Sequence, residues 1–139
     1  MSQVLDGRGA PLPFRHRCSA HLAVGAARLL AHLSPKRLGA LLTLLRRGAR
    51  PATYDEALRA RGHVTTVSTL CAGTYCLPRS LATVLLCRMR GVWPTWCTGV
   101  RTPPFSAHAW VEAEGRRVGE PAGTAAYRPL LVVPPHASP

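Results

Sequence analysis

The sequence is poor in acidic residues and contains a single lysine, Lys36. Lysine and arginine together number 18 against 6 aspartates and glutamates, which gives a formal net charge of +12. Such an excess favours contact with nucleic acid, an anionic membrane or an acidic peptide. The arginines are nevertheless scattered, and no helix-turn-helix, zinc-finger or RNA-recognition signature occurs. We therefore expect no specific nucleic-acid partner, while association with a membrane surface stays open as an alternative.

Long apolar runs are also missing. The segment from Met1 to Pro13 has no basic start followed by an apolar stretch, so it lacks the features of a secretory signal. No uninterrupted apolar stretch approaches the length that spans a bilayer. We expect a cytoplasmic protein, in which cysteines are mostly reduced thiols rather than disulfides. The five cysteines are Cys18, Cys71, Cys76, Cys87 and Cys97.

A paired C-x-x-C element, the usual mark of a structural zinc site, does not occur in the chain. A zinc site would have to draw on Cys71, Cys87 and Cys97, with His63 as a fourth ligand. Cys87 falls inside an apolar helical pattern, which is typical of a buried thiol that behaves as a small hydrophobic residue. We therefore expect buried thiols and no metal.

Leucine-rich segments in the first half have the periodicity of amphipathic helices. The first runs from Ala20 to Leu33, and Ser34 with Pro35 then provides an N-cap and a first helical residue for the second. A third helix should begin at Thr53, which has a glutamate three residues later in capping-box spacing. From Val64 onward the β-branched residues allow either a continued helix or a strand.

The second half predicts one helix followed by a small antiparallel sheet. Cys76 opens the helix and Gly91 closes it. Glu114 and Gly115 form a hairpin turn signal, after which the chain should return antiparallel to the preceding strand. The predicted strands are Trp93–Val100, His108–Glu112, Val118–Glu120 and Tyr127–Val133.

The length of 139 residues fits one domain and leaves no room for a second core. Helices followed by a short antiparallel sheet predict an α+β fold, with the helical N-terminal half packed on the sheet. The expected divisions of the single domain at 1–139 are a flexible arm at 1–19, a helical part at 20–70, a mixed core at 71–133 and a tail at 134–139.

Cys76 stands where a thiol becomes nucleophilic. As the first residue of a predicted helix it lies beside partial positive charge and N–H groups without helical partners. Together with a nearby histidine, such a setting lowers a thiol pKa from about 8.5 to between about 3.5 and 7.5. The backbone N–H of Cys76 can also help to stabilise an oxyanion.

His108 and Glu120 are the candidates for a base and for the group that orients it. His108 begins a predicted strand facing the helix, so the sheet can hold its imidazole beside the thiol. If the hairpin turns at Glu114-Gly115, Glu120 lies opposite His108 on the returning strand. A carboxylate there accepts the second ring N–H and sets the histidine tautomer. The alternative is a buried structural cysteine with a hydrogen-bonded structural histidine.

Two motifs carry a family resemblance: Cys-Leu-Pro-Arg-Ser-Leu-Ala from Cys76, and His-Ala-Trp-Val-Glu from His108. From Cys76 through Glu120 the chain resembles the transglutaminase-like superfamily with its papain-like core. More narrowly, it is similar to the protease proteins of lasso-peptide biosynthesis. The resemblance implies that Cys76 is the nucleophile and His108 the base. Glu120 takes the position usually held by aspartate, and its longer side chain is a departure from the family pattern.

That resemblance also implies a reaction and its partners. The protein would be a cysteine protease that cuts the leader from a precursor peptide made of leader and core. It resembles the short members of the family, which depend on a separate leader-recognition protein, because the chain has no spare length for such a domain. An ATP-dependent macrolactam-forming cyclase would act next. The resemblance implies no metal and no organic cofactor for the protease.

Three further residues lie near the predicted site. Ser80 shares the helix face of Cys76 and can touch substrate or backbone, whereas Arg79 can bind a carboxylate. Trp110 shares the strand face of His108 and either walls the cleft or belongs to the core. Two other functions stay open: an acyl transferase that uses the same three residues with an amine acceptor, and a non-enzymatic basic binding protein.

Overall fold

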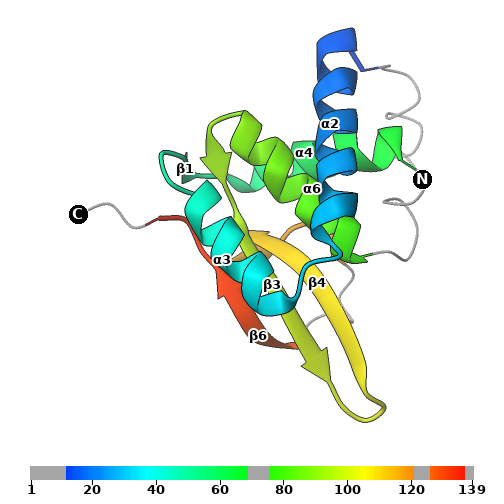
Figure 1. Cartoon of the computed structure of the whole chain (residues 1–139), viewed down its shortest axis with the longest axis vertical. Helices are drawn as coiled ribbons and strands as arrows, with labels where there is room; N and C mark the ends of the chain where they lie inside the picture. Colours follow the sequence, from blue (N-terminus) through cyan, green and yellow to red (C-terminus); the bar gives the residue numbers. More distant parts are fainter. Residues whose placement is uncertain (1–11, 69–75, 121–125, 137–139) are drawn as a thin grey trace.

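The computed structural model describes residues 12–68, 76–120 and 126–136 (Figure 1). Its described residues form a helical layer packed on a small antiparallel sheet, so the predicted α+β class is confirmed. The helices are α2 (Phe14–Leu30), α3 (Pro35–Leu45), α4 (Tyr54–Val67) and α6 (Cys76–Met89). The strands are β1 (Arg50–Pro51), β2 (Val92–Trp93), β3 (Thr95–Arg101), β4 (Ser106–Ala113), β5 (Arg116–Arg117) and β6 (Arg128–Val133).

The first helix is displaced from its predicted bounds. α2 begins at Phe14, so residues 14–19 are helical and do not belong to a flexible arm, while residues 1–11 lie outside the described residues. Pro13 precedes the helix without a side-chain cap, which is why no capping signal marked this start. No helix in the described ranges combines the length and the apolar character needed to cross a membrane.

The starts of α3 and α4 follow the predicted capping rules. The Ser34 hydroxyl accepts the backbone N–H of Arg37 at 3.3 Å. At α4, the hydroxyl of Thr53 accepts the N–H of Glu56 at 3.1 Å, and the Glu56 carboxylate accepts the N–H of Thr53 at 2.9 Å. This reciprocal pair satisfies two N–H groups that a helix start otherwise leaves without partners. Residues 64–67 continue α4, which excludes the strand alternative for them.

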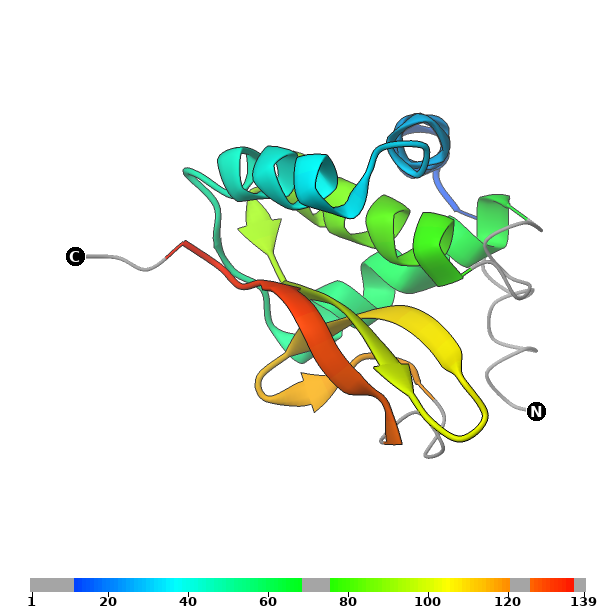
Figure 2. The same cartoon turned by 60° about the horizontal axis from the view of Figure 1, so that its bottom comes forward.

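Helix α6 is buried by its neighbours on nearly every side. It contacts α2, α4 and strands β2, β3 and β4, and Figure 2 shows it between α2 and the sheet. Its middle, Ser80–Cys87, is buried except at Leu85. Met89, in its last turn, is exposed. Elements from both halves of the chain thus enclose the middle of α6.

The sheet has the strand order β5-β4-β3-β6 with antiparallel neighbours. The predicted strand Trp93–Val100 is divided at Pro94, which cannot donate a ladder hydrogen bond. Its first part, β2, pairs in parallel with β1 in a separate two-stranded sheet that the sequence did not predict. The predicted hairpin turn is confirmed: Glu114 has φ of 55° and Gly115 has φ of 75°. Two successive positive φ values are typical of a tight type I′ turn.

Arg90, which directly follows α6, contacts one histidine on α2 and another on α4. Its Nη2 lies 3.0 Å from Nδ1 of His16 on α2 and 2.8 Å from Nδ1 of His63 on α4. A guanidinium only donates hydrogen bonds, so each Nδ1 must accept and each imidazole must be neutral. Burial, followed by the positive charge of Arg90, lowers the pKa of His63 to about 4. Protonation of this histidine would therefore set cations against one another inside the helical layer.

We predict that the free energy of unfolding falls as the pH is lowered from about 6.5 to about 4. In this window the unfolded chain binds a proton at His63 that the folded chain excludes, so acid favours unfolding. Allowing for screening by solvent, the loss should be on the order of 1 kcal/mol. Urea unfolding at several pH values measures it. The variant His63→Gln should flatten this pH dependence and the exposed-site control His21→Gln should not. Identical pH dependence in His63→Gln and the unaltered protein would contradict the prediction.

Candidate active site

Cys76 and His108 line the same cleft. Cys76 is the first residue of α6, and His108 lies near the start of β4, which α6 contacts. The cleft has a volume of about 220 Å³ and exposes mainly apolar atoms. Its other lining residues are Leu77, Thr98, Gly99, Val100, Ala107, Ala109 and Leu130. A half-buried thiol at a helix N-terminus is thus combined with an imidazole on the facing sheet, as the sequence predicted.

Glu120 binds His108 directly. Its Oε1 lies 2.6 Å from Nε2 of His108, and the two side chains are only 3% and 13% exposed, respectively. When Nε2–H donates to this carboxylate, Nδ1 is left as the proton acceptor of the neutral ring. The contact therefore selects the tautomer in which Nδ1 can accept a proton.

The route by which Glu120 reaches His108 differs from the predicted strand. β5 ends at Arg117, and only Val118 continues the ladder, donating its N–H to the carbonyl of Val111 at 2.9 Å. At Gly119, where φ is +65°, the chain leaves the strand path. A Cβ there would also lie 3.0 Å from Arg61, so glycine fits both the backbone and the space. The predicted strand Val118–Glu120 is wrong, although the contact it was meant to explain is present.

Two arginines surround the second oxygen of Glu120. Nη2 of Arg61 on α4 lies 3.6 Å from Oε2, and Nη2 of Arg79 on α6 lies 4.0 Å from it. A buried carboxylate needs such opposite charge, because an isolated anion is costly to remove from water. The arginines thus hold one carboxylate oxygen while the other faces the histidine.

The three predicted neighbours have different environments. Arg79 approaches a carboxylate, as predicted, and that carboxylate belongs to Glu120 of the same chain. Ser80 is buried, donating to the carbonyl of Leu77 at 3.0 Å and accepting Nε1–H of Trp96 at 3.0 Å. Trp110 is a buried tryptophan whose ring stacks on His108 with centroids 5.7 Å apart. In these contacts Ser80 supports the helix and Trp110 supports the imidazole.

Arg61, Tyr54 and Tyr127 complete the surroundings of the site and were not predicted. The hydroxyl of Tyr54 accepts the N–H of Gly119 at 3.4 Å, so Tyr54 and Arg61 hold consecutive residues of one bend. They stand seven residues apart and so share a face of α4. The seven-residue spacing is visible in the sequence, but no local sequence signal indicated which face of α4 packs against the sheet. The ring of Tyr127 lies 5.1 Å from the ring of His108.

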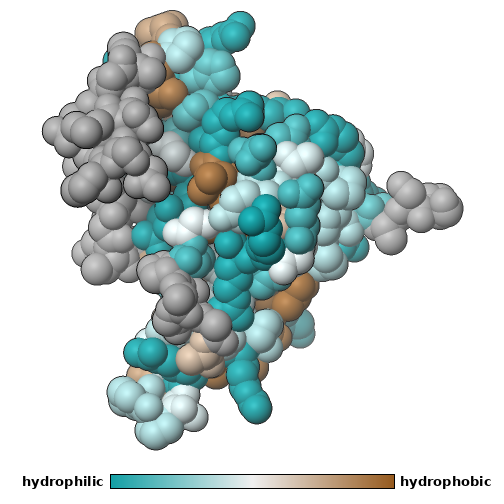
Figure 3. Space-filling view, turned by 180° about the vertical axis from the view of Figure 1, so that it is seen from behind, coloured by the Kyte–Doolittle hydropathy of each residue, from teal (hydrophilic) through white to brown (hydrophobic). Residues whose placement is uncertain are grey.

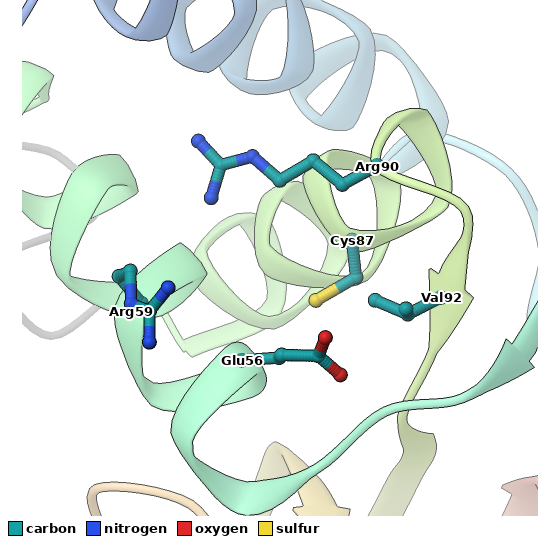
Figure 4. A pocket seen from close by; sticks show the side chains of 5 residues that line it. All are labelled: Glu56, Arg59, Cys87, Arg90 and Val92. Atoms are coloured by element: carbon teal, nitrogen blue, oxygen red, sulfur yellow. The ribbon is translucent and has the colours of Figure 1, made fainter.

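Cys87 and Cys97 are poor candidates for a second nucleophile. Burial raises the pKa of each thiol to about 12. Cys87 lines a separate pocket of about 120 Å³, where its sulfur lies among side chains from α4 and the end of α6 (Figure 4). Within the described ranges no three histidine, cysteine or acidic side chains form a group suited to a metal, and Cys71 lies outside them.

Comparison with protein families finds a match over most of the chain. The profile described as the transglutaminase-like superfamily matches residues 20–132, a span that contains Cys76, His108 and Glu120. Members of this superfamily are typically cysteine-type enzymes. Comparisons with curated proteins and with solved structures find no match.

We predict that Ser80→Ala lowers the free energy of unfolding by about 1–3 kcal/mol, because it leaves the buried Nε1–H of Trp96 without its acceptor. Denaturant unfolding measures the change. Ser19→Ala is the matched control, since Ser19 makes the same kind of bond to the carbonyl three residues earlier. Ser19→Ala should lower the free energy of unfolding by less than Ser80→Ala does. Unchanged stability in Ser80→Ala would contradict the prediction.

Proposed function

Because the chain belongs to the transglutaminase-like superfamily, we propose that it is a cysteine peptidase that cuts the leader from a lasso-peptide precursor. The observation that carries the proposal is the 2.6 Å contact of Glu120 with Nε2 of His108, beside the cleft that Cys76 shares. That contact leaves Nδ1 to take a proton from the thiol. The narrower assignment to lasso precursors rests on the motifs at Cys76 and His108.

In the first half of the proposed reaction Cys76 passes its proton to Nδ1 of His108. The sulfur attacks the carbonyl carbon of the bond between leader and core, and the backbone N–H of Cys76 helps to stabilise the oxyanion. The C–N bond breaks as the protonated imidazole gives its proton to the departing amine. The core leaves with a free N-terminus, and the leader remains as a thioester on Cys76.

In the second half a water molecule replaces the amine. His108 takes a proton from the water, whose oxygen attacks the thioester carbonyl. The C–S bond breaks, the leader leaves with a carboxylic acid terminus, and the proton returns to the sulfur. Glu120 stays ionised throughout and stabilises the imidazolium that forms in each half.

The partners of this reaction are part of the proposal. A separate leader-recognition protein would deliver the precursor, and a macrolactam-forming cyclase would consume the core that is released. Free amine on the core is the chemistry that a cyclase of this kind needs. An acyl transferase that uses the same three residues is the second candidate, and it is favoured only by the breadth of the superfamily.

We predict that Cys76→Ala and His108→Ala each abolish cleavage, because one lacks the nucleophile and the other the base. The measurement is mass spectrometry of a lasso precursor incubated with its leader-recognition protein and either the unaltered chain or a variant. Leader and core fragments should appear only with the unaltered chain. Full cleavage by Cys76→Ala would end the proposal, and leader joined to an added amine rather than to water would favour the transferase.

We predict that Arg61→Met lowers kcat by roughly tenfold to a hundredfold and leaves KM nearly unchanged, because Arg61 acts on His108 through Glu120 and does not reach the cleft. Arg61→Lys should recover part of the loss by restoring the positive charge. Arg59→Met, an exposed change two residues away on α4, is the control. A loss of equal size in Arg59→Met, or no recovery in Arg61→Lys, would show that the effect is only structural.

A further inference from the structure

Strand β6 is an edge of the four-stranded sheet. It pairs with β3 on one side, and no strand of the described residues pairs with its other side. Two of its apolar side chains are unusually open, since Leu130 is 71% and Val132 is 46% exposed. Exposed apolar edges are a liability that proteins normally cover or charge, because they recruit further strands. This edge is therefore suited to bind an extended chain.

The hydrogen-bonding direction of β6 follows from the ladder itself. The N–H of Val118 donates to the carbonyl of Val111, so Val111 directs its backbone groups toward β5 and away from β3. In an antiparallel sheet, successive residues of one strand direct their backbone N–H and C=O groups to opposite sides. Two paired residues that do not bond to each other direct theirs away from each other. Trp96, opposite Val111, therefore bonds toward Val133, and the next residue of β6, Val132, directs its N–H and C=O outward. An incoming strand would meet both a donor and an acceptor there.

An apolar groove runs beside this edge, between β6 and α3. Its volume is about 560 Å³, and it exposes mainly apolar atoms. Gly39 faces the strand, and a Cβ there would lie 3.4 Å from two methyl groups of Leu131. Leu44 is 57% exposed on the opposite wall. The lining residues are Pro35, Lys36, Gly39, Ala40, Thr43, Leu44, Leu131, Val132 and Val133.

The same strand also leads to the cleft. Leu131, Val132 and Val133 line the groove, whereas the preceding residue, Leu130, lines the cleft together with Cys76 and His108. An extended peptide laid along β6 would therefore pass from the groove to the reactive thiol. This continuity distinguishes β6 from the opposite edge strand β5, none of whose residues lines the cleft.

Charge indicates what kind of peptide fits. Lys36 lines the groove, and no acidic residue does. Lys36 lies toward the start of β6, because Gly39 on the same helix faces Leu131 whereas Arg46, just after α3, donates to the carbonyl of Pro134. Near that same end of β6, Arg101 and Arg128 line a pocket that shares Val100 with the cleft and has no acidic lining residue. The face of the molecule seen from behind is largely hydrophilic with isolated apolar residues (Figure 3). The apolar groove with basic residues toward the cleft thus matches an extended segment in which alternate residues are apolar and an acidic residue stands at the end nearest the cleft.

We propose that β6 binds its substrate by strand addition, taking an extended peptide segment in which alternate residues are apolar, with the apolar side chains in the α3–β6 groove and an acidic residue at the end nearest the cleft. The inference rests on the proposed peptidase function and names the feature of the precursor that the enzyme itself recognises. Backbone hydrogen bonds supply affinity, the groove selects apolar side chains, and the basic residues near the cleft select the acidic one.

The test uses the full chain as Cys76→Ala, so that no turnover occurs, and a short fluorescein-labelled peptide in which valine alternates with threonine between glutamates at its two ends. Fluorescence anisotropy should show binding that weakens by about tenfold in Leu44→Glu, which puts a charge into the groove. Leu29→Glu changes an equally exposed leucine of α2 and should have no effect. A peptide with glutamine in place of glutamate should bind more weakly, and Lys36→Glu should remove that preference.

Methylation of the peptide nitrogens tests strand addition directly. Methyl groups on alternate residues should abolish binding in one register, where N–H groups face β6, and have little effect in the other. Equal loss in both registers, or equal binding by Leu44→Glu and Leu29→Glu, would overturn the inference. So would a dimer of the chain that Leu44→Glu dissociates, since a second copy would then occupy the edge.

Failure of the proposed function gives a different result. Suppose that the unaltered chain cuts no precursor while the labelled peptide still binds β6 in one register. The peptidase function would then be rejected, and peptide binding at the β6 edge would be supported. If the precursor is cut, Leu44→Glu should raise KM and leave kcat nearly unchanged. Cleavage with an unchanged KM in Leu44→Glu would overturn the inference and leave the peptidase intact.

Discussion

Burial of α6 is the constraint on which the rest of the structure depends. The helix contacts α2 and α4 as well as the sheet, and its middle is almost wholly excluded from water. Removal of that apolar surface from water is the main favourable term available to so small a chain. Because the helix cannot turn or slide without exposing this surface, its first residue, Cys76, is held at the sheet. Placement of the thiol is therefore a consequence of core packing.

A second constraint is electrostatic. The chain has three times as many basic as acidic residues, and one of its few carboxylates, Glu120, is buried. Arginines from two helices approach it on one side, and His108 binds it on the other. Part of the arginine excess is thus used inside the fold. Arg88 likewise stabilises the C-terminal end of α3, where its guanidinium donates to the carbonyls of Leu45 and Arg47.

These two constraints join the halves of the chain at one place. α4 belongs to the N-terminal half, yet Tyr54 and Arg61 hold the bend that carries Glu120 to His108. The helical half is therefore more than a cover for the core, since it positions the group that orients the imidazole. The superfamily match from residue 20 to residue 132 includes this helical half as well as the motif-bearing segment.

Features that depend only on contacts between residues a few positions apart could be predicted from the sequence alone. The caps at Ser34 and Thr53, the turn at Glu114-Gly115 and the position of Cys76 at a helix start depend on local hydrogen bonds and backbone preferences. Periodicity likewise determined the α+β class, because the change from helical to alternating spacing is visible along the chain.

Only the tertiary structure decided which side chains meet across elements. The sequence placed Glu120 near His108 but by a strand that ends too early, and it did not predict Arg61, the Ser80–Trp96 bond or the parallel pairing of β1 with β2. A helix has several faces, and which one it turns to the sheet depends on the summed burial of all its neighbours. No single segment of the sequence determines that burial. Cys76, His108 and Glu120 could therefore be predicted from the sequence, whereas the residues that position them could not.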